Sequence, residues 1–290
     1  MKKINNIIWK VKYEKNKNWL KAVDLLKDGL KEYPDNYDLH FELAEIYAKN
    51  NFIVEAIEEY QYLLSKNQQD STILFRIANL YLSIEEYEIA IHYFDLIEEY
   101  FPEIYYNKAI SLNRLGKINE SIALLEDLLQ RTPEFEVGYF FLIEQYLAKK
   151  QYVLAIKKID FVEKKFGKQG QIFYLRGLSY YYLNWWLQAF VEFGKAKKMH
   201  FSSKTFLRIY GLSADKIGKT DLCIKLLKEN IELDPSNSYN YIDLINILMK
   251  HKHFEEAFKI ADKAKKNIGK NQTVSLLFNK ITSEFNKEED

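Results

Sequence analysis

One eight-residue pattern recurs along the chain at nearly constant spacing, and this regularity limits the fold more than any other feature of the sequence. The pattern reads WLKAVDLL at residues 19–26, with a small residue in fourth place and an apolar residue in fifth. Neighbouring copies lie 34 residues apart, apart from one spacing of 31. The small residues are Ala22, Ala56, Ala90, Ser121, Ala155, Ala189, Cys223 and Ala257. Such a period predicts an array of repeats in which each unit contacts its neighbours.

Residues 71–104 show the repeating unit most clearly. Apolar residues from Leu74 to Tyr81 recur at spacings of three and four, which predicts one amphipathic helix. A second stripe with the same spacing runs from Tyr87 to Ile97. Pro102 follows it, and proline cannot continue a helix beyond its first turn. The unit is therefore predicted to be a helical hairpin.

This unit resembles the tetratricopeptide repeat, a helix-turn-helix motif of 34 residues. Its signature positions are filled in residues 71–104 by Leu74, Ile77, Ala78, Tyr81, Ala90, Phe94, Ile97 and Pro102. The resemblance implies an all-α fold, a right-handed α-solenoid superhelix of such repeats. Counting from these anchors gives eight repeats, at 3–36, 37–70, 71–101, 102–135, 136–169, 170–203, 204–237 and 238–271. Residues 272–290 are expected to form a C-terminal capping helix and a charged tail.

The single 31-residue spacing departs from this pattern. Three residues are missing near Phe101 and Pro102, where the turn between the third and fourth repeats is expected. We expect a tighter turn there, which could divide the array into two functional halves. A loop deletion without consequence is the alternative.

Catalytic and cofactor-binding motifs are absent from the sequence. His251 and His253 are two residues apart, so on a helix they point in different directions and do not share a metal ion. The one cysteine, Cys223, excludes a disulfide framework and is expected to pack in the core. We find no Gly-rich phosphate loop and no nucleophile motif. The sequence therefore predicts a non-enzymatic protein without cofactor or metal.

No stretch of the sequence reads as a secretion signal or a membrane span. The apolar run after the basic N-terminus stops at Lys10, and no later window approaches the roughly 18 apolar residues that a span needs. We therefore expect a cytoplasmic protein without integral membrane contact.

In the family that the chain resembles, the first helices of the hairpins line a concave groove. At the fifth position of these helices, five consecutive repeats carry an aromatic residue: Phe41, Phe75, Tyr106, Phe140 and Tyr174. Aromatic rings suit the binding of an extended or helical peptide. Other residues assigned to this groove are Glu45, Arg76, Asn79, Asn107, Glu144, Tyr181, Arg208 and Asn246. If the register is wrong by one residue, the rings instead belong to the core.

Two adjacent tryptophans mark the turn of the sixth repeat. Trp186 is expected to pack between the helices. Trp185 has less reason to be buried, and beside Tyr181 and Tyr182 it could act as a binding hot spot. Local packing of Trp185 is the alternative.

Charge is distributed unevenly along the chain, although the net charge is only +1. Residues 37–135 contain 7 basic and 18 acidic residues, a net charge of −11. Residues 136–271 contain 24 basic and 14 acidic residues, a net charge of +10. We expect no nucleic-acid partner, because the chain as a whole lacks a basic excess. The opposite signs favour a homo-oligomer that pairs the acidic half of one chain with the basic half of another.

These observations together predict a scaffold or adaptor that binds a protein or peptide ligand in an aromatic-lined groove. The alternatives are a self-assembling subunit and a non-catalytic accessory subunit of an enzyme complex.

Overall fold

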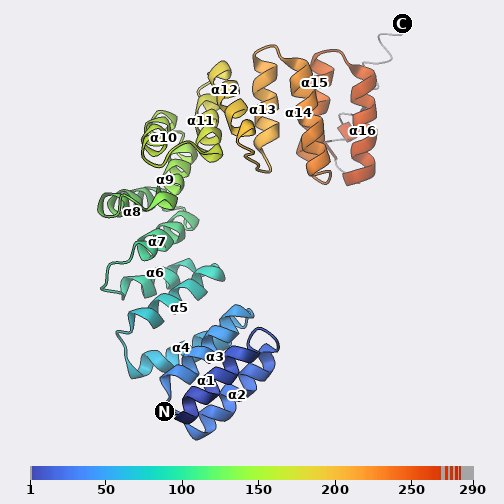
Figure 1. The fold of residues 1–290 in the computed structure, drawn as a ribbon. Helices are drawn as coiled ribbons and strands as arrows, with labels where there is room; N and C mark the ends of the chain where they lie inside the picture. The colour runs from blue at the N-terminus through green and yellow to red at the C-terminus, as the bar shows by residue number, and fades with distance from the viewer. Residues whose placement is uncertain (1, 269–271, 274, 277, 280, 282–290) are drawn as a thin grey trace. The chain divides into compact units, whose positions relative to one another are not determined.

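The computed structural model describes residues 2–268 and, beyond them, residues 272–273, 275–276, 278–279 and 281. Within these residues the chain forms sixteen α-helices (Figure 1). The helices are α1 (Lys2–Glu14), α2 (Trp19–Glu32), α3 (Tyr37–Lys49), α4 (Ile53–Lys66), α5 (Ser71–Ser83), α6 (Tyr87–Asp95), α7 (Pro102–Arg114), α8 (Ile118–Arg131), α9 (Glu136–Ala148), α10 (Tyr152–Phe166), α11 (Gly170–Tyr182), α12 (Trp186–Lys198), α13 (Phe206–Lys216), α14 (Thr220–Leu233), α15 (Ser238–Lys250) and α16 (Phe254–Ile268).

The helices are organised as hairpins. In each hairpin an odd-numbered helix packs against the even-numbered helix that follows, as α3 does on α4 and α11 on α12. The even-numbered helix then packs against the first helix of the next hairpin, as α4 does on α5. The hairpins fall into two compact units, an N-terminal unit (Met1–Gly138) and a C-terminal unit (Tyr139–Asp290). The prediction of an all-α fold built from helix-turn-helix repeats is confirmed.

The turn inside each hairpin has the same backbone conformation. One residue at its centre has a positive φ, for example Asn51 (64°), Asn184 (62°) and Gly218 (77°). The backbone N–H of the next residue donates to the carbonyl five residues earlier, as from Trp185 to Tyr180 at 2.9 Å. This is the hydrogen bond that closes a Schellman motif at a helix C-terminus. Gly116 and Gly218 adopt this conformation without steric cost, because glycine has no Cβ.

The small residues of the repeated pattern lie where the two helices of a hairpin meet. All eight, from Ala22 to Ala257, are fully buried. Ser121 keeps its hydroxyl satisfied by donating to the carbonyl of Ala109 at 2.8 Å. Cys223 is buried in the core as expected, and burial raises the pKa of its thiol to about 12. The pattern thus reports the contact surface between paired helices.

The expectation of a tighter turn near Phe101 and Pro102 is wrong. The missing residues are taken from helix α6, which has 9 residues, whereas α4 and α8 have 14 each. The connection from α6 to α7 then runs through residues 96–101 and is longer than the four residues between α4 and α5. Pro102 is the first residue of α7, where its missing N–H and fixed φ suit a helix start.

The predicted capping helix at 272–290 falls mostly outside the described residues. Those that are described, up to Ile281, are helical. Ile281 is buried, and the Phe278 ring lies 4.8 Å from that of Phe258 in α16. Both residues join the hydrophobic cluster formed by α13 to α16.

Candidate partner-binding surface

The three predicted aromatic residues of the N-terminal unit are half-buried. The Phe41 ring lies 6.0 Å from Tyr60 of α4, and the Phe75 ring lies 6.1 Å from Phe94 of α6. Tyr106 contacts Phe135, with ring centroids 5.6 Å apart. Each ring therefore leans on another part of its own repeat and leaves part of its surface to solvent.

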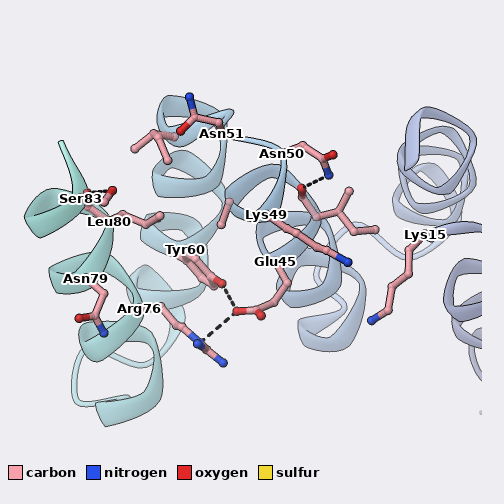
Figure 2. A pocket seen from close by; sticks show the side chains of 13 residues that line it. Lys15, Glu45, Lys49, Asn50, Asn51, Tyr60, Arg76, Asn79, Leu80 and Ser83 are labelled. Carbon is pink, nitrogen blue, oxygen red and sulfur yellow. Dashed lines mark hydrogen bonds and ion pairs between the residues drawn. The ribbon is translucent and has the colours of Figure 1, made fainter. Parts of the chain in front are cut away.

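A polar pocket of about 510 Å³ opens between α3, α4 and α5 (Figure 2). Glu45 and Arg76 lie at its centre, with the Arg76 Nε 3.0 Å from a carboxylate oxygen of Glu45. The hydroxyl of Tyr60 also donates to Glu45, and burial together with this hydrogen bond holds the pKa of Tyr60 above its usual value. Lys15, Lys49 and Asn79 also line the pocket. Three residues predicted for the groove, Glu45, Arg76 and Asn79, thus contribute to one cavity.

A second, smaller pocket lies on the other side of Arg76. It has a volume of about 280 Å³ and is lined by Phe75, the exposed ring of Phe101 and the first turn of α5. The polar residues Glu99 and Glu103 stand at its border. Arg76 lines both pockets, so a polar site and a largely aromatic site lie next to each other in the N-terminal unit.

Side-chain amides connect the first helices of the third and fourth repeats. Asn107 of α7 donates through Nδ2 to Oδ1 of Asn79 in α5, at 2.7 Å. Asn79 in turn donates to the carbonyl of Phe75, at 3.0 Å. Glu45 and Arg76 connect α3 with α5 from the same two repeat positions. The sequence named these four residues, but their pairing across repeats is visible only in the structure.

In the C-terminal unit the predicted residues do not form one cluster. Phe140 is half-buried, while Glu144 and Asn246 are exposed. Tyr174 stacks on Phe201, with ring centroids 4.6 Å apart. Arg208 of α13 pairs with Asp243 of α15, which contributes to a raised pKa of its guanidinium group.

The predicted neighbours of Trp185 are wrong, although its exposure is as expected. Trp185 is 49% exposed, and its ring stacks on Tyr180 at 5.6 Å. Tyr181 instead contacts Trp186, at 5.2 Å, and Tyr182 stacks on Tyr152, at 5.3 Å. The cause is helix geometry, because consecutive residues on a helix point in different directions.

Two buried charged clusters were missed by sequence reasoning. Arg176 of α11 contacts Glu192 at 2.9 Å, Asp160 at 2.9 Å and Glu163 at 2.6 Å. Asp215 of α13 accepts from Lys250 at 2.6 Å and contacts Nε2 of His251 at 2.7 Å. The signal for the first cluster was a charged residue at a repeat position that is apolar in most other repeats.

Neither cluster has the composition of a metal site. Among the residues that the structure describes, no group of three or more His, Cys, Asp or Glu side chains could hold a metal ion. No helix in the described part of the chain combines the length and the apolar character needed to cross a membrane.

Two stretches of the chain, residues 15–71 and 75–134, match sequence profiles of the tetratricopeptide repeat. The chain is a tetratricopeptide repeat protein. This family generally provides protein–protein interaction domains and is typically non-catalytic.

Solved structures share this tetratricopeptide repeat fold. The C-terminal part of a repeat protein from Cytophaga hutchinsonii aligns with a TM-score of 0.63 and 19% identity, over 82% of this chain and 98% of that chain. Cut9, from the APC/C hetero-tetramer Cut9-Hcn1, aligns with a TM-score of 0.60 and 14% identity. That match covers 91% of this chain and 52% of the other, so this chain spans about half the length of that relative.

Yeast Tom70 aligns with a TM-score of 0.58 and 12% identity, over 93% of this chain and 59% of that chain. At these identities the likeness establishes the fold alone. No curated protein matches the sequence.

Proposed function

We propose that this repeat protein is a non-catalytic scaffold that binds a peptide or helix of a partner protein on the surface lined by its first helices. The observation that carries the proposal is the pair of adjacent pockets around Arg76 in the N-terminal unit. Ligand sites in proteins commonly combine an apolar cavity with a few convergent polar groups.

The two pockets suit different parts of a peptide. An apolar side chain can fill the pocket of about 280 Å³ between Phe75 and Phe101. The neighbouring main-chain amides can then exchange hydrogen bonds with Asn79 and with the paired charges of Glu45 and Arg76. Main-chain hydrogen bonds supply affinity and side-chain pockets supply specificity in such recognition.

The proposal is tested by closing the smaller pocket without disturbing the core. Thr72 is exposed on the first turn of α5 and lines this pocket, so Thr72→Arg places a long charged side chain in it. Partners are captured from native extract, identified, and then titrated as purified proteins by calorimetry. We expect the substitution to weaken binding at least about tenfold, because a charge that enters an apolar pocket loses hydration.

Gln61→Arg is the matched control, because Gln61 is exposed on α4 and lines neither pocket. Circular dichroism confirms that both variants are folded. Equal affinity of the Thr72 variant and the wild type for every captured partner would place recognition elsewhere on the chain.

Self-assembly is the second candidate function, and the segregation of charge favours it. The charge changes sign at residues 135–136, three residues before the division between the two compact units. Each unit thus carries its own sign of charge over most of its length, as expected for an association of one unit with the opposite unit of another copy.

A further inference from the structure

We propose that one edge of the C-terminal unit docks on the surface of an anionic lipid bilayer. This edge, which we call the turn edge, consists of the turns inside four successive hairpins and the helix ends that adjoin them. The turns are residues 149–151, 183–185, 217–219 and 251–253. The proposal concerns a surface distinct from the two pockets near Arg76.

Contacts between neighbouring hairpins show that the four turns lie along one edge. Tyr152, after the first turn, stacks on Tyr182, before the second. Lys216, before the third turn, lies with its Nζ 5.4 Å from the ring centroid of Trp186, just after the second. His251 in the fourth turn reaches Asp215 near the end of α13. In Figure 1 the turns that join α13 to α14 and α15 to α16 lie on the same side of this unit.

The centre of the turn edge exposes large apolar side chains. Trp185 is 49% exposed, Leu187 is 61% exposed and Val153 is 54% exposed. Leu154 and Tyr182 are also exposed beside them. The stacking of Trp185 on Tyr180 and of Tyr182 on Tyr152 fixes the directions of these rings. A neighbouring set of exposed apolar residues on a folded protein commonly marks an interaction site.

Lysines flank this apolar centre. Lys149 and Lys150 lie on one side, in the turn before Tyr152. Lys216 and Lys219 lie on the other side, around the turn at 217–219, and Lys252 follows in the next turn. The four turns contain no acidic residue.

The carboxylates near the turn edge are mostly engaged by other cations. Asp215 is buried and bonded to Lys250 and His251. Glu255 pairs with Lys259 and Glu256 with Lys228, each at 2.5 Å, which leaves Asp221 as an exposed negative charge at the start of α14. The turn edge is therefore positive where it meets solvent.

This arrangement fits a membrane surface better than a folded partner. Tryptophan and tyrosine favour the zone between lipid headgroups and acyl chains, because their rings are apolar and their N–H and O–H groups stay hydrated. Lysines beside them attract anionic headgroups. The apolar residues stand at hairpin ends, so Trp185 and Leu187 can enter the headgroup layer while the lysines remain at its surface.

Vesicle flotation tests the proposal with the full chain. Vesicles of phosphatidylcholine alone are compared with vesicles that also contain about 30% phosphatidylserine, a fraction that gives the surface a negative potential. We expect at least about tenfold stronger partitioning to the anionic vesicles, which weakens as salt screens the lysines. Trp185→Ala should lower this partitioning at least about fivefold, because it removes the largest inserting side chain. The double variant Lys150→Glu and Lys219→Glu should lower it by a similar factor or more.

Trp9→Ala is the matched control for the tryptophan, because Trp9 is 67% exposed but lies on α1 in the N-terminal unit. Lys31→Glu and Lys66→Glu together control for the change in charge. Neither control should alter partitioning. Equal binding to neutral vesicles, no binding to anionic vesicles, or unchanged binding of the Trp185 variant would each overturn the proposal. So would a loss of self-association in that variant without vesicle binding by the wild type, since it would assign the turn edge to a second copy of the chain.

Discussion

Arg176 shows how one residue can hold three helices together. It stands on α11 and contacts carboxylates of α10 and α12, while only 7% of the residue is exposed. Burial disfavours its charge, but hydrogen bonds to Glu163 and Glu192 outweigh this effect and raise the pKa of Arg176. Loss of one partner from a buried ion pair typically costs about 3–5 kcal/mol, because the remaining charge stays buried. The cluster thus fixes where the fifth and sixth repeats meet.

Asp215 gives the fold a pH dependence with a defined sign. Burial opposes its charge, yet hydrogen bonds from Lys250 and His251 hold the pKa of Asp215 below its usual value. Because the folded-state pKa is lowered, the carboxylate stabilises the fold fully above its unfolded pKa of about 3.9 and loses this effect as the pH falls through the folded-state pKa. We expect Asp215→Asn to be less stable than the wild type at pH 7, with a difference that shrinks as the pH falls below about 4. Urea unfolding at several pH values measures it.

Asp28→Asn serves as the control for this prediction. Asp28 is exposed and pairs with Lys31 one turn away on the same helix, so its loss should change stability by less than about 0.5 kcal/mol. A gap between wild type and the Asp215 variant that widens toward acid pH would contradict the assignment.

At the scale of the element, close packing of paired helices depends on Gly177. A Cβ added there would lie 2.6 Å from Cε1 of Phe193, whose ring is fully buried in α12. Alanine is the better helix former by about 1 kcal/mol, but this clash has no room to relax. We expect Gly177→Ala to lower the free energy of unfolding by about 1–3 kcal/mol, measured by urea unfolding.

Gly194 offers a matched comparison within α12, the partner helix of α11. The atom nearest to an added Cβ there is the Tyr210 hydroxyl, at 3.3 Å. Gly194→Ala should therefore leave stability unchanged or raise it by up to about 1 kcal/mol. Equal effects of the two substitutions would show that helix propensity, and not the helix contact, sets their outcome.

Helix α6 shows where sequence reasoning about elements was insufficient. The 31-residue spacing revealed that three residues were missing, but a count does not locate the loss. In the structure α6 ends at Asp95, and residues 96–101 follow without regular structure. Side chains hold this segment, since Tyr100 bonds to Thr132 at 2.7 Å and the Arg131 guanidinium lies 5.6 Å from the Tyr100 ring centroid. These partners lie more than 30 residues away, so local patterns could not predict the contact.

At the scale of the whole molecule, charge segregation leads to a prediction about self-association. If the acidic and basic halves pair between copies, the average mass measured by sedimentation equilibrium should fall as the salt concentration rises from about 0.05 to 0.5 M. Glu85→Lys with Glu86→Lys, in an exposed turn of the acidic half, should weaken the association further. Asp221→Lys, which makes the basic half more positive, should not. A monomer under every condition would reject self-assembly and leave the peptide-binding proposal untouched.

The sequence by itself determined the repeat, the hairpin and the surface on which paired helices meet. These follow from local rules, because helical periodicity and buried small residues leave a pattern that returns at every repeat. The tertiary structure alone decided how the predicted surface residues combine. It joined Glu45 with Arg76 and Asn79 with Asn107 across repeats, and it gathered the buried charges around Arg176 and Asp215. Such pairs depend on side-chain directions across neighbouring helices, which the period of a sequence does not specify.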